Sequence, residues 1–260
     1  MLSLFLALAG GLTAPPRSST DALPATLPLQ EAPPAEDKAP EWTGSVTLGG
    51  KYTFGNSEAR SATATADAAL RRENDRFSLG FLWLYEENKN NPLNEWDLTD
   101  RRTQGFGQYD YFFSKKTYGY GKAALQNDLQ SDVKLRQTYT LGVGHQFRED
   151  ETLKLNGEAG ISYVDEDFRN SEDSDYVAAR AAYNVDWQIS KSWGFGQKTE
   201  VYPSLEDSDD IYVSADTRLK AAFGESMFGQ LQWLYAWDSS PAEGKERTDQ
   251  QFLLSIGWKF

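Results

Sequence analysis

The chain has 260 residues, a formal net charge of -13 and an isoelectric point near 4.6. This acidic balance excludes nucleic acid as a partner, because nucleic-acid binding needs a basic surface. Mean hydropathy is -0.63 and no run of about 18 apolar residues occurs, so no transmembrane helix is predicted. The absence of cysteine excludes disulfides and thiolate metal sites. The length suits one barrel or sandwich domain, or two small domains.

The N-terminus reads MLSLFLALAGGLTA over residues 1–14. A short apolar stretch is followed by small residues, with Ala7-Leu8-Ala9 as a candidate cleavage motif, so we predict a signal segment that lacks the usual basic start. The alternative is a buried N-terminal segment. Residues 15–41 are rich in Pro and Ala without periodicity, which predicts a disordered linker.

From Trp42 onward, apolar and polar residues alternate. In the first segment Val46, Leu48 and Tyr52 share one face, while Ser45, Thr47 and Lys51 share the other. Period two over ten or more residues predicts strands about twice the usual length of about 5–6 residues. The predicted strands are 42–54, 58–72, 76–87, 101–113, 117–127, 134–148, 152–165, 175–190, 192–202, 211–224, 226–238 and 247–260.

The connections between these strands alternate between short turns and longer polar loops, except for a tight first connection at Gly55-Asn56-Ser57. Long strands, an even strand number and loops that are long at one end only are typical of outer-membrane barrels. We therefore predict an all-β fold for residues 42–260: a transmembrane antiparallel up-and-down β-barrel of about twelve strands. The alternative is a soluble all-β fold, such as a periplasmic barrel that binds an apolar ligand.

The polar face of the strands combines small residues with charges of both signs, which suits the crowded inside of a narrow barrel. The charges predicted to face the lumen are Arg136, Lys154, Glu158, Arg180, Asp186, Asp216 and Arg218. They either pair and plug the barrel or form a hydrated ladder for small ions, and twelve strands do not decide between the two. Aromatic residues near strand ends are predicted at the lipid–water boundaries: Tyr118, Tyr120, Trp187, Trp193, Trp237 and Trp258.

The chain ends on LLSIGWKF, with an apolar residue at every second position. We predict that this face of the last strand meets lipid and that the strand closes the barrel against the first. The pattern resembles the C-terminal signal that the barrel assembly machinery of bacteria recognises. The residues of this predicted assembly signal are Phe252, Leu254, Ile256, Trp258 and Phe260.

Three stretches carry a family resemblance: residues 42–57, the run RQTYTLGVGHQF at 136–147 and the run EAGISYVDEDF at 158–168. Together they resemble the YdiY-like family of salt-induced outer membrane proteins, a domain of unknown function, over roughly residues 42–260. The resemblance implies a barrel in the bacterial outer membrane, in contact with its lipid and lipopolysaccharide. Its motifs are turns and barrel strands, and they bring no catalytic residue or cofactor.

The single histidine is the main candidate for chemistry. His145 shares its face with Val143 and Phe147, so a hydroxyl nucleophile would have to come from a neighbouring strand. We predict that the protein is not an enzyme and needs no cofactor; a lipid- or peptide-cleaving barrel hydrolase is the alternative.

Acidic residues cluster in and beside the longer loops, where they would attract cations to a pore mouth or hold divalent ions that bridge to lipopolysaccharide. We predict a structural barrel or a narrow, cation-favouring pore. The candidates for cation attraction are Asp165, Glu166, Asp167, Asp207, Asp209 and Asp210.

Overall fold

The computed structural model describes residues 40–53, 58–89 and 95–260. The predicted signal segment, the predicted linker up to residue 39 and the tight turn at 55–57 lie outside the described residues. The described part contains no helix long and apolar enough to cross a membrane.

The residues that the structure describes form twelve strands, as the alternation of apolar and polar residues predicts, and every predicted boundary falls within four residues of the observed one. The strands are β1 (Trp42–Thr53), β2 (Ala59–Arg71), β3 (Asp75–Asn88), β4 (Asp97–Phe112), β5 (Thr117–Asp128), β6 (Val133–Glu149), β7 (Leu153–Phe168), β8 (Ser174–Gln188), β9 (Trp193–Pro203), β10 (Ile211–Ala222), β11 (Met227–Asp238) and β12 (Thr248–Lys259).

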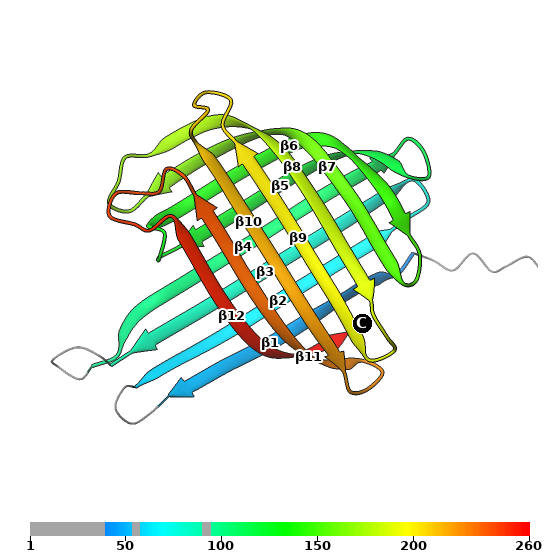
Figure 1. Ribbon diagram of the computed structural model, residues 1–260, viewed down its shortest axis with the longest axis horizontal. Helices are drawn as coiled ribbons and strands as arrows, with labels where there is room; N and C mark the ends of the chain where they lie inside the picture. Colours follow the sequence, from blue (N-terminus) through cyan, green and yellow to red (C-terminus); the bar gives the residue numbers. More distant parts are fainter. Residues whose placement is uncertain (1–39, 54–57, 90–94) are drawn as a thin grey trace, which may run out of the picture. The chain divides into compact units, whose positions relative to one another are not determined.

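Each strand pairs antiparallel with its neighbours in the chain, and β12 returns to β1, so the sheet is a closed barrel (Figure 1). The connections 72–74, 113–116, 150–152, 189–192 and 223–226, together with Trp42 and Phe260, lie at one end, which we call the turn end. The connections 129–132, 169–173, 204–210 and 239–247 lie at the other, which we call the loop end.

The closing seam is the shortest ladder among the described strands. Only Ser45–Gly49 of β1 pair with β12, and the two strands diverge toward the loop end (Figure 1). At the turn end the backbones of Gly44 and Phe260 exchange two N–H···O bonds, 3.0 and 3.1 Å long. The last residue is therefore held in the seam by its main chain.

The two faces of the sheet differ sharply in polarity. Large apolar side chains are exposed on the outside, such as Leu141 (74 % exposed) and Leu254 (75 %), while Arg136, Glu158 and Arg180 are buried inside. An apolar exterior around a polar interior is the arrangement of a membrane-spanning barrel, since lipid surrounds it and closure pairs the backbone. The predicted fold class is confirmed.

One prediction about the aromatic residues is wrong. Tyr118 and Tyr120 do not lie at a lipid boundary but point into the barrel, where they are 0 % and 4 % exposed. Neighbouring β6 makes room for them, since a Cβ on Gly144 would lie 2.2 Å from the Tyr118 ring and one on Gly142 would lie 2.7 Å from Tyr120. The small residues of the polar face thus give space to inward aromatic rings.

The connection 129–132 is shorter than the loop that alternation predicts there. Asp128 stabilises the turn, because its Oδ1 accepts the backbone N–H of Gln130 and of Ser131 at 3.0 and 3.2 Å. Asp132 completes the reversal with a φ of 64°, a conformation that Asp tolerates better than most residues.

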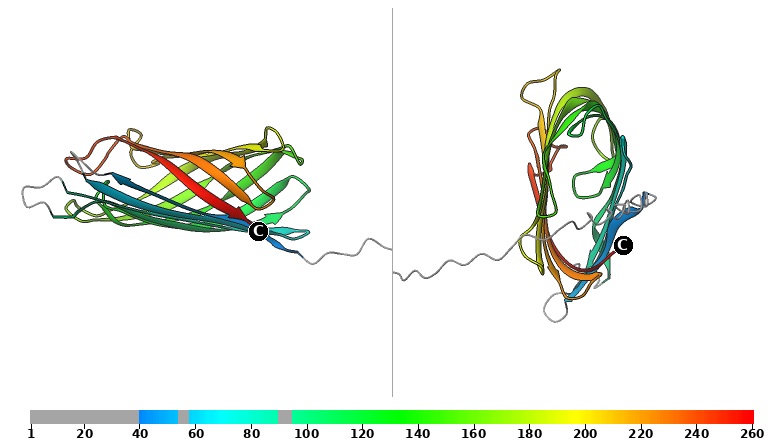
Figure 2. Two further views of the ribbon diagram at one scale, coloured as in Figure 1. Left: turned by 90° about the horizontal axis from the view of Figure 1, so that it is seen from below. Right: turned by 90° about the vertical axis from the view of Figure 1, so that its right-hand side faces the viewer.

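The barrel is flattened in cross-section, so opposite walls approach each other (Figure 2). Leu84 of β3 packs inside the barrel against Leu234 of β11 and Leu253 of β12, with Leu82 beside them. This apolar cluster narrows the interior behind the seam and leaves the remaining space to polar groups.

Candidate functional site in the barrel interior

A network of buried charges occupies the middle of the barrel, with Arg180 of β8 at its centre. The guanidinium donates to Glu158 at 2.8 Å, to Glu200 at 2.6 Å and to the hydroxyl of Tyr120 at 2.7 Å. Lys122 forms an ion pair with the same Glu200 from across the lumen. We call Lys122, Glu158, Arg180 and Glu200 the central charge network.

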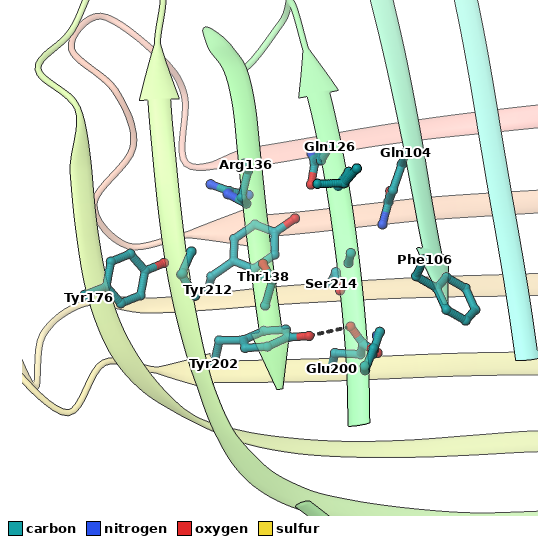
Figure 3. A pocket seen from close by; sticks show the side chains of 14 residues that line it. Gln104, Phe106, Gln126, Arg136, Thr138, Tyr176, Glu200, Tyr202, Tyr212 and Ser214 are labelled. Carbon is teal, nitrogen blue, oxygen red and sulfur yellow. Dashed lines mark hydrogen bonds and ion pairs between the residues drawn. The ribbon is translucent and has the colours of Figure 1, made fainter. Parts of the chain in front are cut away.

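Tyrosine hydroxyls complete the bonding of its two carboxylates. Tyr118 donates to Glu158 at 2.9 Å, and Tyr202 donates to Glu200 at 2.8 Å, the bond drawn in Figure 3. Buried carboxylates need such partners, because an unpaired ion in a low-dielectric interior is strongly unfavourable.

A second set of charges joins β2 to β9 and β10 across the lumen. Asp67 pairs with Lys198 at 3.2 Å and with Arg218, which also binds Asp216 at 2.6 Å. Gln232 donates to Asp216 at 3.0 Å. These pairs cross-brace the barrel without filling it.

Ion pairs also lie toward the loop end. Arg102 pairs with Asp128 at 2.5 Å, and Arg136 pairs with Glu166 and, at 3.8 Å, with Asp238. Arg136 and Tyr212 project into the same interior space in Figure 3, with the Arg136 guanidinium 4.5 Å from the Tyr212 ring.

The interior holds cavities from one end to the other. A loop-end vestibule of about 290 Å³ adjoins two central cavities of about 50 and 130 Å³, with which it shares Gln126 and Tyr212. Two turn-end cavities, of about 400 and 490 Å³, share six lining residues with each other and form what we call the turn-end vestibule. Three residues line both central cavities and the larger turn-end cavity: Phe106, Lys122 and Glu200. They form the neck of the lumen.

The structure places all seven charges predicted for the lumen against these cavities. Arg136 borders the loop-end vestibule, while Lys154, Glu158, Arg180 and Asp186 border the turn-end vestibule. Asp216 and Arg218 border a central cavity. Their positions follow the odd or even place of each residue in its strand, because side chains of a strand alternate between its two faces.

The acidic residues predicted to attract cations lie in different environments. Glu166 is buried and paired with Arg136, whereas Asp165 and Asp167 are its outward-facing neighbours near the end of β7. Asp207, Asp209 and Asp210 lie in the connection 204–210. Within the described ranges, no three His, Cys, Asp or Glu side chains are arranged to hold a metal ion.

The carboxylate of Asp210, in the connection 204–210, has a raised pKa. Burial raises the pKa of Asp210 above its ordinary value, and the nearby carboxylates of Asp238, Glu166 and Asp207 raise it further. Several acids near the loop end are therefore close enough to repel one another.

A pH-dependent gain in stability is expected from Asp210→Asn. Because the folded state raises the pKa of Asp210, its ionised form is unfavourable above that pKa, and protonation relieves this as pH falls through it. The variant should raise the urea midpoint at neutral pH, and the gain should vanish in acid. Asp209→Asn, at an exposed position of the same loop, is the matched control; an equal gain in both variants would contradict the role of burial.

His145 has a hydroxyl partner on the outer face of the barrel. Its Nδ1 lies 3.0 Å from Oγ1 of Thr117 on β5, and its ring meets Phe147 edge-on at 5.2 Å. Within residues 40–53, 58–89 and 95–260, His145 has no carboxylate or amide bonded to its other ring nitrogen, the group that orients the base in a hydrolytic triad.

The C-terminal residues proposed as an assembly signal all lie on the outside. Exposed fractions range from 40 % for Trp258 to 75 % for Leu254. The full set is Phe252, Leu254, Ile256, Trp258 and Phe260.

The family model described as "Protein of unknown function, DUF481" matches residues 46–260. No curated protein matches the chain by sequence. Among solved structures, the NanC porin in a rhombohedral crystal form is 11 % identical with a TM-score of 0.50, covering 83 % of this chain and all of the porin. This likeness concerns the fold alone.

Two further structures resemble the chain more distantly. The translocator domain of the autotransporter NalP from Neisseria meningitidis is 14 % identical with a TM-score of 0.45, covering 84 % of this chain and 88 % of the domain. An outer membrane channel from Pseudomonas putida F1 is 9 % identical with a TM-score of 0.45, covering 88 % of this chain and all of the channel.

Proposed function

The chain belongs to the DUF481 family of proteins of unknown function, and from that premise we propose that it is a narrow pore of the bacterial outer membrane. The observation that carries this proposal is the series of cavities that share lining residues from the loop-end vestibule, through the neck, to the turn-end vestibule. Such a lumen suits small ions and solutes, because its central cavities, about 50 and 130 Å³, are smaller than the vestibules.

The orientation follows from the connections. Outer-membrane barrels have short periplasmic turns and longer extracellular loops. The turn end, with Trp42 and Phe260, would therefore face the periplasm, and the loop end would face the outside of the cell.

We further propose that the outer mouth favours cations. Asp207 and Asp209 are exposed there, and Asp210 lies beside them. Clustered carboxylates at a mouth raise the local concentration of cations and provide ligands for divalent ions, which would also link the loops to anionic lipopolysaccharide. The test is the reversal potential of the current across a salt gradient. In Asp207→Asn/Asp209→Asn the reversal potential should shift toward anion selectivity. An unchanged reversal potential, or a wild-type current that millimolar calcium does not alter, would contradict the proposal.

Widening the neck is the direct test of conduction. Phe106→Ala removes a ring that lines three cavities in succession, so the single-channel conductance in a planar bilayer should rise. Tyr109→Ala, on the outward face of the same strand, should leave the conductance unchanged. No current from either folded variant or the wild type, with folding shown by a heat-modifiable gel shift, would refute the pore and leave a structural role.

We propose that the outward C-terminal residues are read by the barrel assembly machinery. Deleting Phe260 removes two backbone bonds to Gly44 and the contact of a mostly exposed ring with that residue, so refolding of the purified chain should be little changed. Yield in the outer membrane of cells should fall strongly. An equal loss in both settings would mean that Phe260 acts through stability rather than recognition.

A further inference from the structure

The loop-end vestibule and the larger cavity of the turn-end vestibule differ in charge. Four cationic and four anionic side chains line the loop-end vestibule. The cavity of about 490 Å³ at the turn end is lined by eight cationic side chains and five anionic ones, in a chain that has 26 Lys and Arg against 39 Asp and Glu. Cationic side chains thus outnumber anionic ones in this cavity, although the whole chain is acidic.

Half of these eight cations have no ion-pair partner. In the described part of the chain, no carboxylate oxygen lies within 4.0 Å of the charged nitrogens of Arg71, Lys154, Lys220 or Lys259. The other four cations are paired: Arg76 with Asp110, Arg180 with Glu158 and Glu200, Lys122 with Glu200, and Lys198 with Asp67. Among the described carboxylates that line this cavity, Glu149 and Asp186 are likewise without an ion pair.

Aromatic rings lie against three of the four free cations. The guanidinium of Arg71 lies 3.5 Å from the centre of the Phe112 ring. The ammonium groups of Lys220 and Lys259 lie 5.0 and 5.7 Å from the ring of Phe228, which is fully buried. A ring face attracts a cation but does not neutralise its charge, so these groups remain available to an anion.

The space and the charges together indicate a ligand. A cavity of about 490 Å³ falls within the range of small-molecule sites, roughly 300–1,000 Å³. The free cations come from four strands around the wall: β2, β7, β10 and β12. A solute with several separated negative charges can therefore contact cations from more than one of these strands.

We propose that the larger cavity of the turn-end vestibule binds a small solute that carries two or more carboxylate or phosphate groups and enters from the turn end. The low-dielectric wall focuses the field of the unpaired cations into the cavity. Binding there does not require a conducting neck, so this inference goes beyond the proposed pore function.

The test is titration calorimetry on the refolded full chain, with citrate and inorganic pyrophosphate as separate probes. We expect saturable binding of at least one probe that weakens as salt increases. The two probes distinguish a carboxylate site from a phosphate site. In Lys220→Gln/Lys259→Gln the affinity should fall by about tenfold or more, because contacts to two charged groups are lost.

The matched control is Lys115→Gln/Lys116→Gln, which removes the same charge from an exposed turn at the same end, outside the cavity lining. Its affinity should stay at the wild-type value. Equal weakening in both variants would reduce the effect to general attraction and overturn the site, as would no binding of either probe to folded wild type. Anion binding by a chain that carries no current would refute the proposed pore and support the proposed binding site. Current without anion binding would support the pore and refute the site.

Discussion

Replacing Arg180 should destabilise the barrel by about 3–5 kcal/mol, because one partner of a buried ionic cluster is lost. Its side chain is 2 % exposed and contacts two carboxylates and two tyrosine hydroxyls. In Arg180→Met, Glu158 would be left without a cation, and Glu200 would keep only Lys122. The measurement is the urea midpoint of the refolded protein in detergent micelles, converted to a free energy of unfolding.

A second substitution separates charge from packing. Adding Glu158→Gln to Arg180→Met removes the uncompensated carboxylate, so part of the lost stability should return. Arg148→Met is the control, since Arg148 pairs with Asp150 at an exposed turn, where ion pairs contribute little. If Arg180→Met is no worse than Arg148→Met, water in the lumen already solvates these carboxylates and the central charge network does not stabilise the fold.

The strands could be predicted because their signal is local. The alternation of apolar and polar residues within one segment, such as 153–163, predicts both that the segment is a strand and which of its faces meets lipid. The same parity placed Arg180 and Glu158 inside the barrel. The apolar pattern at the C-terminus also predicted that the barrel closes. It did not predict that only Ser45–Gly49 pair with β12, because the sequence of one strand does not determine its register with another.

The contacts across the lumen could not be predicted. Lys122 and Glu200 are 78 residues apart, and Arg218 and Asp67 are 151 apart, and no periodicity tells which inward side chains will face each other. That depends on the flattened cross-section, which the Leu84 cluster reflects. The neck residue Phe106 was missed for this reason.

The aromatic prediction failed at Tyr118 for a different reason. Tyrosine near a strand end is typical of lipid boundaries, and this general preference was given more weight than parity, which placed Tyr118 on the same face as Lys122. The available signal was the pair Gly142 and Gly144 on the next strand, which provides space for inward rings. Glycine opposite tyrosine in adjacent strands was the better guide.

This pairing leads to the second large effect, a loss of about 1–3 kcal/mol in Gly144→Ala, as is usual for overpacking. The added Cβ would lie 2.2 Å from the Tyr118 ring, and the ring cannot move aside without loosening its hydrogen bond to Glu158, which is 2.9 Å long. Gly194→Ala also adds an inward methyl, but its nearest neighbour would be 3.7 Å away, so stability there should change little.

The cause of the loss can be isolated with a double-mutant cycle. If the clash with the ring is responsible, Gly144→Ala should have almost no further effect in a Tyr118→Ala background, where the ring is absent. Additive losses would instead assign the effect to the backbone of β6, because glycine would then be required for its own conformation. A non-additive result would establish that inward rings on β5 and glycines on β6 form one packed unit, which positions the hydroxyl of Tyr118 for the central charge network.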